Sequence, residues 1–325
     1  MSDTTRRKFT AAAAGALAVA AFPSMAQDAW PSRPVKLIIP FPPGGATDSV
    51  GRIVAQQLSA MWKQPVVVDN KPGAGTIIGT DAVAKAAADG YTLGMVISAH
   101  NINPSLRPRM PYDTVKDFAG ISHVGIQHLC IAAHPLVEAN NIPELIALAK
   151  KNPGKLGYAS PGSGTAMHLA MELFNVNAGI KITHIPYKGG APAQQDVVGG
   201  QVPLIVDVYH SIAPLMKAGR LKPIAMLSPK RLAALPNVQT ISETIPSVVA
   251  LSILGVVAPA GTPRAVVNKI SADIAAMLKT PAVAAQFAEM GIEPVGSTPE
   301  AYDALIASEI AKWVPVVKAS GATVD

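Results

Sequence analysis

The stretch VKLIIPFPPGGATDSVGRIVAQQLSAMW, residues 35–62, decides the fold class. Residues 35–41 are an apolar run typical of a buried strand, and a proline- and glycine-rich turn ends it. Residues 49–62 follow with apolar side chains at helical spacing: Val50, Ile53, Val54, Leu58 and Met61. A strand that leads through a glycine turn into an amphipathic helix predicts α/β architecture.

The same alternation continues along the chain. Strand-like runs follow at 64–70, 91–100, 181–187 and 202–209, with another strand, glycine turn and helix at 155–176. Helical patterns occur at 76–90, at 142–151, from Pro263 onward and from 297 onward. In the last of these, Ser297 and Glu300 have the spacing of a capping box, which predicts that Ser297 caps the helix.

Two extended apolar segments that end in proline, 128–135 and 253–261, look like crossings between lobes. If both cross, residues 27–131 and 254–325 form one domain and residues 132–253 form the other. A single continuous α/β sheet is the alternative, and the pattern alone leaves both open.

Composition excludes several classes of protein. Hydrophobic residues make up 49% of the chain and charged residues 15%, which is far from the composition of a disordered chain. The single cysteine, Cys130, excludes an internal disulfide, and the seven histidines show no metal-binding spacing. The sequence therefore predicts no metal, no cofactor and, since its charges form no run, no nucleic-acid partner.

The N-terminus has the features of an export signal. Arg6 and Arg7 precede an alanine-rich stretch, and small residues favour cleavage after Ala26. The twin arginine indicates the twin-arginine route, and an ordinary secretory signal is the alternative. Removal of residues 1–26 changes the formal net charge from +6 to +4. No later segment is apolar enough to span a bilayer, so we expect an exported, soluble protein.

Two glycine turns are candidates for anion binding. PGGAT (43–47) and PGSGT (161–165) each lie between a strand and a helix, and each places a threonine where the helix should begin. Glycines bring backbone N–H groups close to a ligand, and the free N–H groups of the following helix add a positive dipole end. Facing each other from two lobes, the turns would hold a carboxylate from both sides.

The two turns lack the motifs of other binding and catalytic sites that are built on glycine turns. Neither turn has the lysine of a P-loop or the spacing of a dinucleotide fingerprint, and Ser163 lacks the flanking glycines of a nucleophile elbow. A triad of Ser163, His168 and Asp207, as in an exported serine hydrolase, stays a weaker alternative. Asp48 is expected to cap a helix, or to hold a water or an amino group of the ligand. Lys188 is expected either to supply a positive charge or to be a solvated lysine on a loop.

Six stretches together resemble the Bug-type solute-binding receptors of tripartite tricarboxylate transporters. They are WPSRPVKLIIPFPPGGATD, VVDNKPGAGTIIGTDAVAKAAADGYTL, YDTVKDFAGIS, KLGYASPGSGTAMHLAMELF, IPYKGGAPAQQDVVGGQVPLIVD and APAGTP. The resemblance covers nearly the whole chain after residue 26. It implies a type II-like periplasmic binding protein, a clamshell of two lobes joined by two crossing strands with the ligand cleft between them.

The resemblance also implies a function and a site. The protein would capture a small carboxylate and deliver it to a membrane permease, as a monomer and without catalysis; a sensor for a membrane kinase is the alternative. The expected ligand-binding residues are Phe41, Gly44, Gly45, Ala46, Thr47, Asp48, Ser98, Ser160, Gly162, Ser163, Gly164, Thr165, His168, Tyr187, Lys188, Gly189, Asp207 and Tyr209. Tyr209 and His210 depart from the family pattern, which leaves open whether the ligand is aliphatic, aromatic or an amino acid.

Overall fold

Strands and helices alternate along residues 30–324, the part of the chain that the computed structural model describes. The predicted export signal at residues 1–26 lies outside the described residues. The strands are β1 (Val35–Ile39), β2 (Val66–Asn70), β3 (Thr92–Ile97), β4 (Phe118–Ala133), β5 (Gly157–Ser160), β6 (Thr183–Pro186), β7 (Leu204–Val208), β8 (Lys222–Met226), β9 (Leu251–Pro259) and β10 (Ile292–Pro294).

The helices cover this sheet. They are α2 (Ala46–Trp62), α3 (Ile77–Ala84), α4 (Ala99–Leu106), α5 (Ile142–Lys151), α6 (Ala166–Ala178), α7 (Gly190–Val198), α8 (Tyr209–Lys217), α9 (Arg264–Leu278), α10 (Pro281–Glu289) and α11 (Pro299–Ser320), with short 3₁₀ turns at Ala74–Thr76 and Ile241–Glu243. Residues from Pro34 onward form one compact unit. Within the described range, none of the helices combines the length and the apolar composition needed to cross a membrane.

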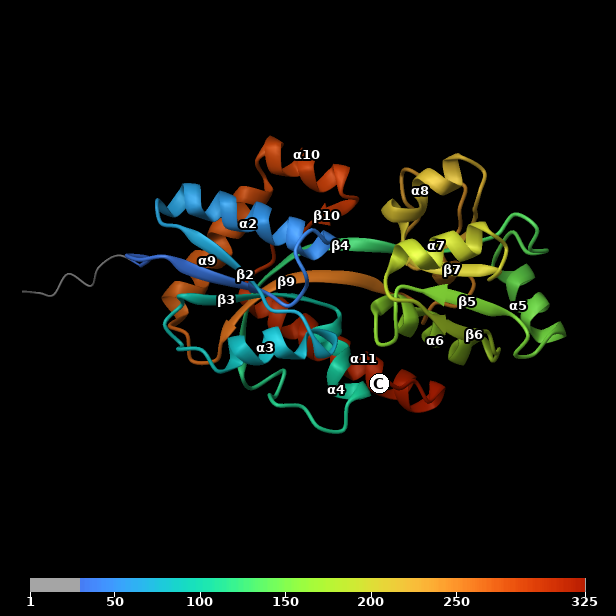
Figure 1. Ribbon diagram of the computed structural model, residues 1–325, viewed down its shortest axis with the longest axis horizontal. Helices are drawn as coiled ribbons and strands as arrows, with labels where there is room; N and C mark the ends of the chain where they lie inside the picture. The colour runs from blue at the N-terminus through green and yellow to red at the C-terminus, as the bar shows by residue number, and fades with distance from the viewer. Residues whose placement is uncertain (1–29, 325) are drawn as a thin grey trace, which may run out of the picture. The chain divides into compact units, whose positions relative to one another are not determined.

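The strand order is β2-β1-β3-β9-β4-β7-β5-β6, and β8 and β10 also pair with β4. The long strand β4 takes part in both halves of the sheet, because residues 118–128 pair with β9 and residues 129–133 pair with β7. We call the half around β1–β3 the first lobe and the half around β5–β7 the second lobe. Figure 1 shows β4 and β9 running side by side between them.

The predicted α/β fold of two lobes joined by two crossing strands is confirmed by this topology. The hydrogen-bonded sheet is nevertheless continuous through β4. The structure therefore combines the two alternatives left open by the sequence, because its two lobes share one continuous sheet. The domain boundaries placed near residues 131 and 254 stay a prediction.

The first lobe is built on the stretch that predicted it. β1 pairs in parallel with β2 and β3, and α2 buries Val50, Val54 and Leu58 against it. Gly51 makes this packing possible, because a Cβ at that position would lie 2.4 Å from Ile39 Cδ1. Strand and helix therefore approach closely, which fixes the position of the turn between them.

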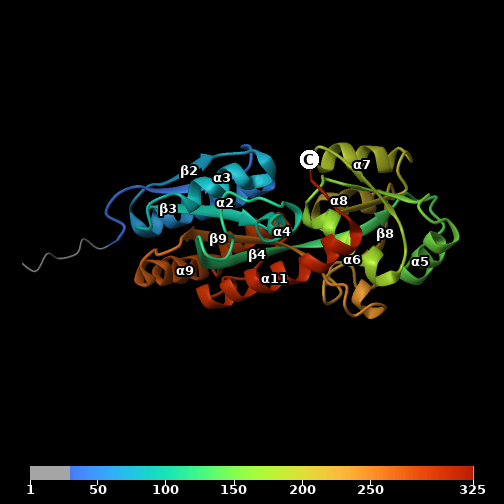
Figure 2. The same cartoon turned by 90° about the horizontal axis from the view of Figure 1, so that it is seen from below.

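The second lobe repeats the arrangement, with β5 parallel to β6 and β7. Helix α6 buries Leu169 and Phe174 in a core that also contains Trp313 of α11. The C-terminal part of α11 thus packs against α6, while its N-terminal part lies along β4 in the first lobe (Figure 2).

Three local predictions are wrong. The helix expected at 76–90 ends at Ala84. The strand expected at 91–100 ends at Ile97, and α4 begins at Ala99 because Ile102 and Leu106 bury an apolar face in the core. The cap of α11 is Thr298, whose side chain accepts from Ala301 N–H, rather than Ser297. The Ser297 hydroxyl instead accepts the N–H of His123, which ties the start of α11 to β4.

Candidate binding cleft

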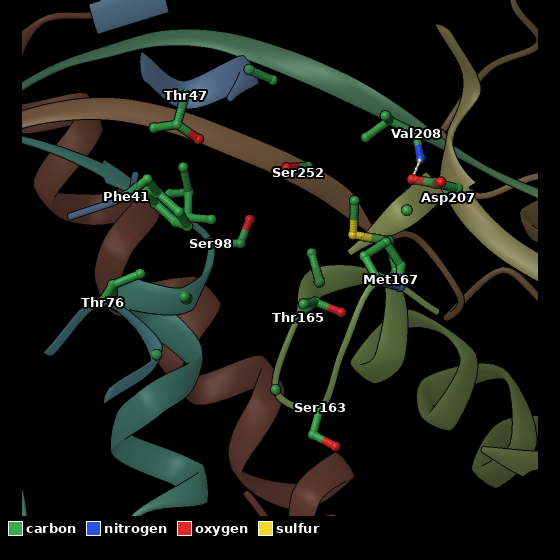
Figure 3. Close-up of a pocket in the computed structure, with 18 of the residues that line it drawn as sticks. Phe41, Thr47, Thr76, Ser98, Ser163, Thr165, Met167, Asp207, Val208 and Ser252 are labelled. Atoms are coloured by element: carbon green, nitrogen blue, oxygen red, sulfur yellow. Dashed lines mark hydrogen bonds between the residues drawn. The ribbon is translucent and has the colours of Figure 1, made fainter. Parts of the chain in front are cut away.

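A cavity of ≈ 790 Å³ lies between the two lobes. Its first-lobe wall includes Phe41, Thr47 and Ser98, and its second-lobe wall includes Thr165 and Met167 (Figure 3). Gln127 of β4 and Ser252 of β9, which pair with each other across the crossing strands, also line it. The cavity therefore meets both lobes and the strands that connect them.

The structure brings ten of the expected ligand-binding residues together around this cavity. They are Phe41, Ala46, Thr47, Ser98, Ser163, Gly164, Thr165, Tyr187, Lys188 and Asp207. The other eight do not line it: Gly44, Gly45, Asp48, Ser160, Gly162, His168, Gly189 and Tyr209. Most of these eight lie directly behind the lining residues and shape the turns. That the expected set binds a ligand stays a prediction.

Asp48 stabilises the first turn from behind. Its buried carboxylate accepts from Gly44 N–H at 2.8 Å, Arg52 Nε at 2.8 Å and Asn70 Nδ2 at 2.9 Å. Burial alone would raise the pKa of this carboxyl, but the three hydrogen bonds, that from Arg52 first, hold it at about 2. Asp48 is therefore ionised and fully engaged. Gly45 is the N-cap of α2 without a side-chain cap, and Thr47 is the second residue of the helix.

The second turn is held by different contacts. Thr165 is the N-cap of α6, and its hydroxyl accepts from His168 N–H at 3.2 Å, as expected for a threonine at the start of a helix. The N–H of Gly164 donates to Nδ1 of His168 at 3.1 Å. This ring nitrogen must be unprotonated to accept, and burial lowers the pKa of His168 to about 4.

Four backbone N–H groups at the two helix ends form no hydrogen bond to any described residue. They belong to Ala46 and Thr47 at the start of α2 and to Ala166 and Met167 at the start of α6, and all four residues line the cavity. Such N–H groups carry the positive end of the helix dipole. Two helix N-termini from different lobes therefore contribute donors to one cavity, an arrangement suited to an anion.

The triad considered for a hydrolase is not assembled. The ring of His168 accepts from Gly164 and stacks on His184 at 3.8 Å, and no hydrogen bond joins it to Ser163 or Asp207 within residues 30–324. The Ser163 hydroxyl points away from Thr47 and Ser98 (Figure 3). His184 in turn contacts Ser160 Oγ at 2.7 Å, so the histidine pair supports the second turn from behind.

Asp207 lines the cavity at the end of β7, as expected for a polar group at the end of a buried strand. Its carboxyl accepts from Gln194 Nε2 at 2.9 Å and from Val208 N–H at 2.7 Å. Burial raises the pKa of this carboxyl above the usual range for an aspartate. Gly190 leaves room for it, because a Cβ there would lie 2.9 Å from Asp207 Oδ2.

Several lining residues were not expected from the sequence. They include Gly75, Thr76, Asn103, Arg107, Gln127, Met167, Gln194, Ser211, Ser252 and Val324. Gly75 and Thr76 lie in a third glycine turn, KPGAGT at 71–76, and this motif could have indicated their position from the sequence. For Arg107 and the residues of the crossing strands, no sequence motif marks a position in the cavity.

Comparison with known proteins agrees with this geometry. The sequence model of one protein family, the tripartite tricarboxylate transporter family receptor (TctC), matches residues 50–322. Protein BugT of Bordetella pertussis is 39% identical over 298 residues, which cover 91% of each chain. The structure of the periplasmic binding protein BugD has a TM-score of 0.76 at 34% identity and covers 90% of this chain and 99% of its own.

A protein of R. palustris solved with adipate is 33% identical, has a TM-score of 0.79 and covers 90% of this chain and 99% of its own. MatC from Rhodopseudomonas palustris, solved with bound malate, is 27% identical with a TM-score of 0.76 and covers 89% of this chain and all of its own. The family match, the two-lobed fold of the present chain and these relatives lead to one conclusion. The chain belongs to the tripartite tricarboxylate transporter receptor family, whose members are periplasmic solute-binding proteins.

Proposed function

We propose that this receptor captures a small carboxylate between its lobes and delivers it to a membrane permease without chemically changing it. The observation that carries the proposal is the pair of helix N-termini, of α2 and α6, whose unpartnered N–H groups line one cavity. The adipate and malate in related structures support the ligand class. The family supports the permease as partner.

The same proposal includes the finer expectations from the sequence. Residues 1–26 act as a cleaved export signal, and the receptor works as a monomer. The chain passes from one domain to the other near residues 131 and 254. The residues expected to bind the ligand do so directly where they line the cavity, or through the turns where they lie behind it.

The energetic basis is the set of charge-assisted hydrogen bonds. Each bond from a backbone N–H to a carboxylate contributes roughly 1.5–3 kcal/mol. Four of them offset the entropy lost when a small ligand is immobilised, and the expected affinity is then near micromolar.

Calorimetry with matched ligands tests the proposal. Each acid of a panel of mono-, di- and tricarboxylates is compared with its neutral amide, which has nearly the same shape. We expect at least one acid to bind and its amide to bind at least 10-fold more weakly. If no acid binds, or if acids and amides bind equally, the proposal is wrong.

Ala46→Pro provides a variant that removes one donor from the cavity. Ala46 is the first residue of α2, where proline fits a helix well, and Gly45 before it has an extended backbone compatible with proline. We expect a loss of acid affinity with little change in stability. Arg264→Pro, at the first position of α9 outside the cavity, is the matched control and should bind the acid normally.

A further inference from the structure

The segment that follows the last helix, residues 321–324, reaches the cleft between the lobes. Helix α11 ends at Ser320, and its C-cap is Gly321 with a φ of +68°. Glycine adopts this left-handed conformation without the steric cost of a Cβ, so the chain can turn sharply here. Figures 1 and 2 show the chain turning back from the end of α11. Three residues after the cap, Val324 lines the cavity.

Val324 lies where both lobes come together. A Cβ at Gly164, in the glycine turn of the second lobe, would lie 2.8 Å from Val324 Cγ1 and 3.2 Å from Leu106 Cδ1. Leu106 belongs to α4 of the first lobe. Val324 and Ala322 also pack against the hydrophobic cluster that contains Leu106. Three segments that are distant in sequence therefore meet at this part of the cavity wall.

Further open space lies on the other side of this wall. A second cavity of ≈ 750 Å³ is lined by residues 319–323 and by part of α6. Ser163 lines both cavities, while Val324 lines the first and Thr323 the second. The glycine turn at Ser163 and the end of the C-terminal segment therefore separate the two cavities. A ligand that extended past Val324 would have to displace it, although there is room behind it.

The chemistry of Val324 suits selection by size. Its side chain offers a ligand only methyl groups, so it can discriminate by shape and volume but not by hydrogen bonding. Gly164, which it touches, directly precedes Thr165, the N-cap of α6. Val324 is thus placed to meet the hydrocarbon body of an acid whose carboxylate is held at the start of α6.

We propose that Val324 is a specificity-determining residue, which ends the cleft beside the Gly164 turn and excludes acids whose hydrocarbon body extends past it. This inference rests on the proposed function, in which the helix N-termini hold the carboxylate. The anion-binding groups then fix one end of the ligand, and the C-terminal segment limits how large the rest of it can be.

Calorimetry with two series of acids tests the inference. The ligands are straight-chain monocarboxylates from acetate to octanoate and dicarboxylates from malonate to suberate. The proteins are the wild type, Val324→Ala, which shortens the side chain, Val324→Ile, which adds one methyl group, and Val324→Thr, which keeps the shape. Val314→Ala is the matched control, because Val314 is a half-exposed valine of α11 that does not line the cavity.

We expect Val324→Ala to bind the first acid that is too long for the wild type roughly 10-fold more tightly, and the shortest acid that binds with nearly unchanged affinity. Val324→Ile should weaken the longest acid that the wild type accepts by roughly 10-fold. Val324→Thr and Val314→Ala should keep the wild-type length preference. Melting temperatures of the unliganded variants report on their folding. Val324→Ile keeps both Cγ atoms next to Gly164, so it gives the readout if Val324→Ala loosens the turn.

The outcomes separate this inference from the proposed function. If the wild type binds no acid of either series, both are wrong. If it binds acids, but Val324→Ala and Val324→Ile change the affinity for every chain length by the same factor or not at all, Val324 does not select by size. Carboxylate capture then stands without it.

Discussion

Some of the expected ligand-binding residues do not line the cavity but support its wall through hydrogen bonds. Asp48 is an example, because the sequence suggests a ligand contact while its carboxylate is 2% exposed and saturated with hydrogen bonds. By accepting from Gly44 N–H, it orients the glycine turn without touching the cavity. A carboxylate in that position also stabilises the N-terminal turn of α2 through the helix dipole.

Asp48→Asn should destabilise the protein in a pH-dependent way. The folded pKa of Asp48 is about 2, below the ordinary value of 3.8 for an aspartate. The stabilisation is therefore fully present above pH 4 and is lost as the pH falls through the folded pKa. The shift corresponds to about 2 kcal/mol at neutral pH.

Urea unfolding from pH 7 to pH 2 measures this effect. The wild type and Asp48→Asn should differ at pH 7 and converge near pH 2. Asp69→Asn, which removes a half-buried carboxylate at the same edge of the sheet, should cost much less. A constant difference between the wild type and Asp48→Asn at every pH would contradict the role assigned to the charge.

At the scale of elements, the two strand–turn–helix units look alike in sequence but differ in how they depend on glycine. Gly45 has an ordinary φ of −81°, and a Cβ there would meet only Pro42 O at 3.9 Å. Gly164 has a φ of +75°, and its Cβ would lie 2.8 Å from Val324 Cγ1 and 3.2 Å from Leu106 Cδ1. The second turn is thus confined by α4 and by the C-terminal segment, whereas the first is open.

Gly164→Ala should therefore destabilise the protein by about 1–2 kcal/mol through its backbone alone, with a further cost from the close contacts. It should also weaken acid binding, since the N–H groups of α6 follow the turn. Gly45→Ala should cost less, because its only loss is the preference for glycine over alanine at an N-cap. Denaturant unfolding and calorimetry on both variants check the contrast, and equal effects at the two positions would refute it.

At the scale of the whole molecule, β4 and α11 connect the lobes in different ways. β4 is shared by both halves of the sheet, and its register against β9 shifts between Gly120 and Ser122 and between His123 and Gly125. Helix α11 packs on α4 in the first lobe and on α6 in the second. Residues of α4 and of α6 line the cavity, so α11 packs against two helices that form its walls.

The repeating strand–turn–helix units could be predicted from sequence because their signals are local. Hydrophobic spacing and glycines mark β1, α2, β5 and α6 within a few residues of their observed ends. Six of the ten expected residues that line the cavity belong to the two turns between these strands and helices: Phe41, Ala46, Thr47, Ser163, Gly164 and Thr165.

The remaining features depend on contacts between distant segments. α4 contains Pro104 and two asparagines, so its sequence has weak helix propensity, and it forms because Ile102 and Leu106 are buried in the core. Arg107 reaches the cavity only because α4 is packed there. No local pattern indicates that position, so the sequence predicted the two glycine turns and Lys188 in the cavity wall but not Arg107.

Amide chemical shifts give the most direct test of carboxylate capture by two helix ends. In ¹⁵N-labelled protein titrated with the tightest-binding acid, the amide protons at the start of α2 and at the start of α6 should move downfield together. Ala46, Thr47, Ala166 and Met167 should report one common dissociation constant. Binding of the acid with no such shift, or with a shift at only one of the two helix ends, would contradict the proposed two-sided site.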